Sequence, residues 1–317
     1  MFPTCRAEGI LTLAIPLHRI YNRTDHSKEA IPLRTLILTD VHGNLPALEA
    51  VLSSPAACGC DDVVSLGDHV SFCAQSREVH DRLVSLGATM LLGNHEERLT
   101  RPADSEFDGY NWAPARFTAR QMAGVDARFP TDMRRDAVLF THGTPGDPYH
   151  LVHPPELPGV LDALPEGVTL LLSGHNHHFW DVTHNGRRAF NPGSVGLAED
   201  GTGCVAPFAV LETNPGQPPA ITRHAVPYDV RATLKAFIST GMCREAPEIC
   251  RAVARVLLTG EYQGVLKLMR HVRAVADARG LSFADQAAWQ LADRTYGWAE
   301  PIPSPEYWNQ LEAMLCR

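Results

Sequence analysis

The sequence lacks an apolar run long enough to cross a membrane. The apolar segment at residues 11–17 has only seven residues and contains Pro16, whereas a spanning helix needs about 20 apolar residues. No small-residue cleavage site follows it where a signal peptide would need one. We therefore expect no membrane partner, and we interpret residues 1–31 as an N-terminal extension ahead of the folded domain.

Paired cysteines are also missing. The chain has eight cysteines but no Cys-x-x-Cys pair, and Cys58 and Cys60 are separated by one residue, which is too tight for a usual zinc knuckle. Neither a structural zinc site nor a disulfide framework is indicated. We expect reduced thiols and a cytoplasmic protein.

Excess positive charge is the third absence. The formal net charge is −8, from 28 basic and 36 acidic residues. An acidic chain is a poor general binder of nucleic acid, so nucleic acid would enter only as a substrate. The composition, 44% apolar and 20% charged, is that of a globular protein with a sizeable core.

Five short polar clusters stand out against this ordinary composition. They are Asp-Val-His-Gly-Asn at 40–44, Gly-Asp-His at 67–69, Gly-Asn-His-Glu at 93–96, Thr-His-Gly at 141–143 and Gly-His-Asn-His at 174–177. Their oxygen and imidazole donors suit borderline divalent ions. The number of donors is too large for one tetrahedral site and fits two ions that share a carboxylate. The candidate ligands are Asp40, His42, Asp68, Asn94, His142, His175 and His177.

Each cluster directly follows an apolar run that is typical of a buried strand. These runs occupy residues 35–39, 63–66, 89–92, 137–141 and 168–172. Helical patterns at 45–52 and 76–86 fill the first gaps, which gives a βαβ rhythm. Because sites in such sheets form at the carboxyl ends of strands, we expect the clusters to converge.

The order of the clusters resembles that of the calcineurin-like metallophosphoesterases. That family carries Asp-x-His, Gly-Asp, Gly-Asn-His-(Asp/Glu), a lone His and Gly-His-x-His, and all five blocks occur here in this order. The resemblance covers about residues 34–226 and is nearest to the small prokaryotic phosphodiesterases and phosphatases. It implies an α/β fold, a four-layer αββα sandwich, which we place at residues 32–228.

The resemblance also implies a role for each ligand. Asp40, His42 and His177 would hold one divalent ion, Asn94, His142 and His175 would hold a second, and Asp68 would bridge the two. Mn²⁺ is the expected metal, with Fe, Zn, Ni and Co as alternatives.

The implied activity is hydrolysis of phosphate mono- or diesters by a metal-bridging hydroxide. His95 occupies the family's catalytic position and would assist the leaving group by donating a proton or hydrogen bond. Asn44, Tyr149 and His150 are candidates for contact with the phosphate-ester substrate, the last two because the loop at 143–160 follows a ligand. A plain connecting loop is the alternative for that segment.

Two departures from the motifs of the Ser/Thr protein phosphatases argue against that branch of the family. Ser/Thr protein phosphatases carry an arginine before Gly-Asn-His-Glu and an Asp-Arg-Gly after the second block, where this chain has Leu92 and His69 to Phe72. Two alternatives stay open, namely a nuclease or nucleotide pyrophosphatase on the same site, and a metal-free scaffold with the same fold. Residues 229–317 lack strand alternation and predict a C-terminal helical appendage, and the oligomeric state cannot be derived from the sequence.

Overall fold

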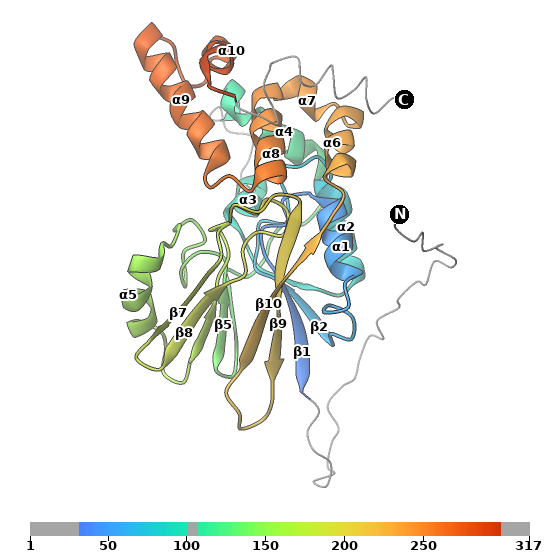
Figure 1. The fold of residues 1–317 in the computed structure, drawn as a ribbon, viewed down its shortest axis with the longest axis vertical. Coiled ribbons are helices and arrows are strands. Elements are labelled where there is room, and N and C mark those ends of the chain that lie inside the picture. Colours follow the sequence, from blue (N-terminus) through green and yellow to red (C-terminus); the bar gives the residue numbers. More distant parts are fainter. Residues whose placement is uncertain (1–31, 101–106, 299–317) are drawn as a thin grey trace, which may run out of the picture.

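The computed structural model describes residues 32–100 and 107–298 (Figure 1). The expected N-terminal extension at 1–31 lies outside the described residues, as does the end of the helical appendage at 299–317. The described part contains two mixed β-sheets that pack face to face, with helices on their outer faces and a helical group at one end.

The first sheet is parallel on one side of its central strand and antiparallel on the other. The strand β1 pairs in parallel with β2, which pairs in parallel with β3, while β9 runs antiparallel to both β1 and β10. The last four residues of β1 are buried, as expected for a strand covered on both faces. In spatial order the strands are β10 (Ala220–Pro227), β9 (Val205–Thr213), β1 (Leu33–Leu38), β2 (Asp62–Ser65) and β3 (Thr89–Met90).

The second sheet places three parallel strands beside two antiparallel edges. A hairpin joins β7 and β8, where Asn185 and Gly186 have φ angles of 48° and 74°. Both lie in the left-handed region that a type I′ turn requires. In spatial order the strands are β4 (Asp132–Arg135), β5 (Val138–Thr141), β6 (Leu170–Leu172), β8 (Arg187–Asn191) and β7 (Trp180–His184).

Apolar side chains from both sheets form the central core, which includes Ile37 and Leu66 from the first sheet and Phe140 and Phe190 from the second. The helices α1 (Leu45–Leu52) and α2 (Ser76–Ser85) cover the outer face of the first sheet, and α5 (Leu157–Asp162) covers that of the second. The predicted four-layer αββα sandwich is confirmed.

The C-terminal helices gather at one end of the sandwich, where they share a core with α4 (Figure 1). The predicted helical appendage is confirmed, and it includes the short α7, whose four residues are too few to show helical periodicity. The helices here are α3 (Asn94–Thr100), α4 (Ala113–Gln121), α6 (Val230–Ser239), α7 (Met242–Glu245), α8 (Pro247–Thr259), α9 (Gly264–Arg279) and α10 (Gln286–Thr295). One short 3₁₀ turn, Tyr110–Trp112, precedes α4, and another, Pro154–Glu156, precedes α5. Among the described residues, no helix is long and apolar enough to cross a membrane.

Candidate metal centre

The loops after the parallel strands bring the five clusters together. The backbone N–H groups of Asp40 and His42 donate to the carbonyls of Gly67 (3.1 Å) and Asp68 (2.9 Å), which ties the first loop to the second. Asp40, His42, Asp68 and His175 have φ angles of 52°, 50°, 51° and 62°. Non-glycine residues in this left-handed region cost about 1–3 kcal/mol each and are typical of functional sites. The surrounding fold therefore imposes strained backbone on four candidate ligands.

Two glycines allow these loops to approach. A Cβ atom on Gly174 would lie 2.0 Å from Oγ1 of Thr39, and one on Gly93 would lie 2.1 Å from Oδ1 of Asp68. Both distances are too short for any side chain. The glycines that open the third and fifth clusters are thus required by the close packing around the two aspartates.

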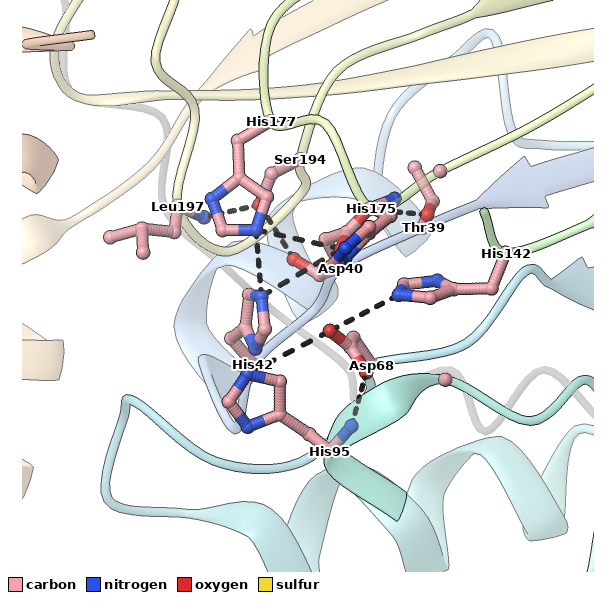
Figure 2. A network of polar contacts seen from close by, with 12 residues as sticks. Thr39, Asp40, His42, Asp68, His95, His142, His175, His177, Ser194 and Leu197 are labelled. Atoms are coloured by element: carbon pink, nitrogen blue, oxygen red, sulfur yellow. Dashed lines mark hydrogen bonds and ion pairs between the residues drawn. The ribbon is translucent and has the colours of Figure 1, made fainter. Parts of the chain in front are cut away.

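The first ligand group consists of Asp40, His42 and His177, as predicted for one ion. The Nε2 atoms of the two histidines lie 2.9 Å apart. Oδ1 of Asp40 lies 3.8 Å from Nε2 of His42 and 3.5 Å from Nε2 of His177. Figure 2 shows the three side chains pointing toward a common point.

The second ligand group contains Asp68, His142 and His175, whose potential ligand atoms lie within 4.8 Å of one another. Nε2 of His142 lies 3.2 Å from Oδ2 of Asp68 and 3.3 Å from Oδ1 of Asn94. Asp68 also forms a group with His42 and with His95 within the same limit. The structure thus brings together all seven predicted ligands, with Asn94 placed by its contact with His142. Figure 2 shows the other six, with Asp68 between the two groups.

The donor set fits divalent cations. Asp40 and Asp68 are almost completely buried, and Oδ1 of Asp40 has no hydrogen-bond partner. An unpaired carboxylate oxygen in the interior is costly unless a cation compensates it. Carboxylate, amide and imidazole donors are those that Mn²⁺, Fe²⁺ and Zn²⁺ accept.

The histidine pKa values show how much positive charge the two carboxylates attract. Burial opposes protonation of His177, but the Asp40 and Glu199 carboxylates outweigh it and raise its pKa to about 10. Burial likewise opposes protonation of His142, whose pKa the Asp68 carboxylate raises to about 9. Burial tends to raise the pKa of Asp40, yet its contacts with His177 hold that pKa well below the usual range. The two carboxylates thus favour positive charge at this centre.

His95 lies at the edge of the two groups. Its Nε2 is 3.9 Å from Oδ2 of Asp68, and its backbone N–H donates to Oδ1 of the same residue at 2.9 Å. The ring packs against Phe72, with centroids 4.9 Å apart, and against His42 at 5.2 Å. Burial lowers the pKa of His95 well below its ordinary value. The side chain faces the centre and is 13% exposed, so it is accessible to a bound substrate.

The side chain of Asn44 is held by hydrogen bonds within the protein. Its side chain is fully buried, and its oxygen accepts hydrogen bonds from the Ala47 backbone at 3.3 Å and from Thr233 at 2.8 Å. Its amide nitrogen donates to the Gly196 carbonyl and the Tyr228 hydroxyl. Both polar atoms of this amide thus make hydrogen bonds within the protein, one of which caps α1, and its contact with substrate stays a prediction.

Tyr149 and His150 lie on an exposed loop beside the second group. The Tyr149 carbonyl lies 3.2 Å from Nε2 of His175, while its hydroxyl bonds to Glu97. The His150 ring pairs with Glu156 at 3.0 Å. Tyr149 thus reaches the centre through its main chain, and the His150 ring is paired with a neighbouring carboxylate.

Two glutamates that support the centre were not predicted. Glu96 is buried and accepts hydrogen bonds from the backbone N–H groups of Asp68 (2.8 Å), Val70 (3.2 Å) and Gly93 (3.0 Å). Burial and the nearby Asp68 charge raise its pKa to about 8. Its place in the Gly-Asn-His-Glu block was the available signal.

Glu199 carries no motif signal at all. Its Oε1 lies 3.7 Å from Nδ1 of His177, and its Oε2 accepts a hydrogen bond from the Gln263 backbone at 2.8 Å. A carboxylate on the far nitrogen of a ligand histidine orients the ring and raises its basicity. The loop before α9 in turn fixes Glu199, so the helical region buttresses a ligand of the sandwich.

Replacing Glu199 with Gln should weaken metal binding without unfolding the protein. The amide can still accept the Gln263 N–H but cannot hold His177 with a negative charge, so we expect affinity to fall about 10–100-fold. Titration of metal-free protein with Mn²⁺, followed by calorimetry, measures this directly. Glu212→Gln is the matched control, because Glu212 is exposed and its carboxylate pairs with Arg34. Unchanged affinity in the Glu199 variant would show that this contact has no role at the centre.

Comparison with known proteins identifies the family. The model of the calcineurin-like phosphoesterase superfamily domain matches residues 33–216. The chain belongs to this superfamily. An uncharacterized protein of Methanocaldococcus jannaschii is similar, with 24% identity over 189 residues that cover 57% of this chain and 77% of that protein.

Two solved structures have a fold similar to that of this chain. A metallophosphoesterase from Sphaerobacter thermophilus is 26% identical, covers 72% of this chain and 99% of its own, and superposes with a TM-score of 0.61. A hypothetical protein from Pyrococcus horikoshii superposes with a TM-score of 0.60 at 17% identity, covering 72% of this chain and 98% of its own. The latter similarity concerns the fold alone.

Proposed function

We propose that this superfamily member hydrolyses phosphate mono- or diesters with two divalent cations, Mn²⁺ foremost. The observation that carries the proposal is the convergence of the two ligand groups on Asp68, with an Asp40 Oδ1 that accepts no hydrogen bond in the first group. A scaffold that had lost its metals would not need strained, buried carboxylates surrounded by histidines. The intact donor set therefore favours catalysis over a purely structural role.

Seven residues would bind the cations, and an eighth, His95, would act in proton transfer. Asp40, His42 and His177 would hold one cation, Asn94, His142 and His175 the other, and Asp68 both. When bound, the cations would neutralise the phosphoryl oxygens and acidify a water molecule. The neutral amide of Asn94 leaves the loaded centre net positive, which favours an anionic ester.

His95 would act on the leaving group. During hydrolysis, a bond forms between phosphorus and the water oxygen while the bond between phosphorus and the leaving oxygen breaks. The leaving oxygen takes a proton or hydrogen bond from the His95 ring, and the proton that the attacking water loses returns through solvent to His95 or to the leaving oxygen. The products are the free alcohol and either inorganic phosphate, from a monoester, or a phosphate monoester, from a diester, so no other reactant is needed.

Removing the metals should abolish hydrolysis. Purified protein treated with a chelator should hydrolyse neither nitrophenyl phosphate nor bis(nitrophenyl) phosphate, and added Mn²⁺ should restore turnover of at least one. Nucleotides and single-stranded DNA in the same panel test the nuclease and pyrophosphatase alternatives. Turnover that persists in the chelated protein, or no turnover of any ester in metal-loaded protein, would contradict the proposal.

A further inference from the structure

A cavity of about 250 Å³ adjoins His95 on the side of α3 and α4. Leu99, Phe107 and Ala115 contribute apolar surface to its walls, and Arg98 and Arg116 also line it. His95 is a wall of this cavity as well as a neighbour of Asp68. The cavity therefore begins where the predicted chemistry takes place.

The two arginines add guanidinium groups to the lining of the cavity. One guanidinium, that of Arg116, donates to the carbonyls of Phe107 and Gly109, the latter at 2.7 Å. The other, that of Arg98, lies over the Trp112 ring, 5.4 Å from its centroid. Guanidinium planes and aromatic rings attract flat π-systems, whereas aliphatic chains gain less from them. The cavity is therefore better suited to an aromatic ring than to a linear alkyl chain.

The position of His95 determines which part of the substrate enters the cavity. If this ring contacts the leaving oxygen, the carbon group on that oxygen lies beside His95, which also lines the cavity. Pockets for drug-sized ligands have about 300–1,000 Å³, so this smaller space fits one part of a substrate. The volume is sufficient for one or two aromatic rings.

We propose that this cavity binds the leaving group, and that the substrates are phosphate esters whose leaving group carries a flat aromatic system. This inference rests on the proposed function, because it uses His95 as the contact with the leaving oxygen. Arg98, Leu99, Phe107 and Ala115 become the residues that determine specificity. Small aliphatic esters would bind through the phosphate alone.

Binding of stable phosphonates to the metal-loaded full chain tests the pocket apart from turnover. Methylphosphonate reports the metal centre, and benzylphosphonate adds one aromatic ring at the position of the leaving group. By calorimetry we expect benzylphosphonate to bind at least about 10-fold more tightly, because the ring leaves water for an apolar wall. Ala115→Leu should remove this advantage by filling the cavity, with methylphosphonate affinity unchanged.

Two further variants complete the design. Ala119→Leu, one helical turn after Ala115, fills the same cavity from a more exposed position and serves if the first variant fails to fold. Ala274→Leu, an exposed alanine on α9, is the matched control and should keep the benzyl advantage. Equal binding of the two phosphonates by the wild type, or an advantage that survives filling, would overturn the pocket while ester hydrolysis persists. Failure to bind either phosphonate, together with no turnover, would overturn the proposed function as well.

Discussion

The isosteric change Asp68→Asn should lower kcat/KM by on the order of 10³-fold or more, the largest loss expected for any single ligand. Asp68 lies between both ligand groups, so the change weakens both cation sites and removes several kcal/mol of transition-state stabilisation. The asparagine oxygen can still accept the His95 backbone N–H, which Oδ1 of Asp68 now accepts at 2.9 Å. The fold around the loop should therefore persist.

Steady-state kinetics with saturating Mn²⁺, together with metal content by elemental analysis, measure this effect. Asp81→Asn is the control, because Asp81 is exposed and pairs only with Arg77 on the same helix among the contacts we observe in the described residues. It should keep full activity and metal content. Asp68→Asn protein that stays active, or that loses less activity than His142→Ala protein, would show that this carboxylate does not bridge.

His95→Ala should keep its bound metal while kcat falls about 10²–10⁴-fold, the usual cost of losing acid–base help. The loss should shrink for esters with good leaving groups such as nitrophenolate, because these need little protonation. The structure makes this test necessary, since His95 can also form a ligand group with His42 and Asp68.

Comparison of a nitrophenyl ester with an alkyl ester in the same variant separates the two roles. His184→Ala is the control, because that ring lies at the end of β7 and pairs with Asp162 at the end of α5. Metal content that falls in step with activity would make His95 a ligand, and an equal loss on both esters would remove it from the leaving group.

The sequence predicted the fold best where a cluster of polar residues directly follows an apolar run. The parallel strands appear where apolar runs precede the clusters, since a buried strand must be apolar on both faces. The ligands then converge because parallel strands end at one edge of a sheet. Asp40 and His177, 137 positions apart in sequence, are thus in contact through Nε2 at 3.5 Å.

Tertiary contacts explain what the sequence did not reveal. Asn44 has the same polar amide whether it faces substrate or caps α1, and only the packing of α6 against α1 shows that its amide is fully used. Glu199 lies outside every motif, and its approach to His177 depends on the loop before α9. Long-range contacts of this kind leave no local periodicity to detect.

The C-terminal helical region therefore contacts residues of the candidate site as well as the sandwich. It shares its core with α4, one wall of the cavity beside His95, and its Gln263 fixes Glu199. Loss of this region would disturb both a candidate ligand and the candidate leaving-group pocket. Its part in the protein would be support of the active site.

The central claim is that each chain holds two cations joined by Asp68. Anomalous scattering from crystals grown with Mn²⁺ tests it most directly. We predict two peaks per chain, one among Asp40, His42 and His177 and one among Asn94, His142 and His175, with the Asp68 carboxylate contacting both. Protein saturated with Mn²⁺ that shows no peak beside Asp68, or a single peak remote from it, would contradict the account.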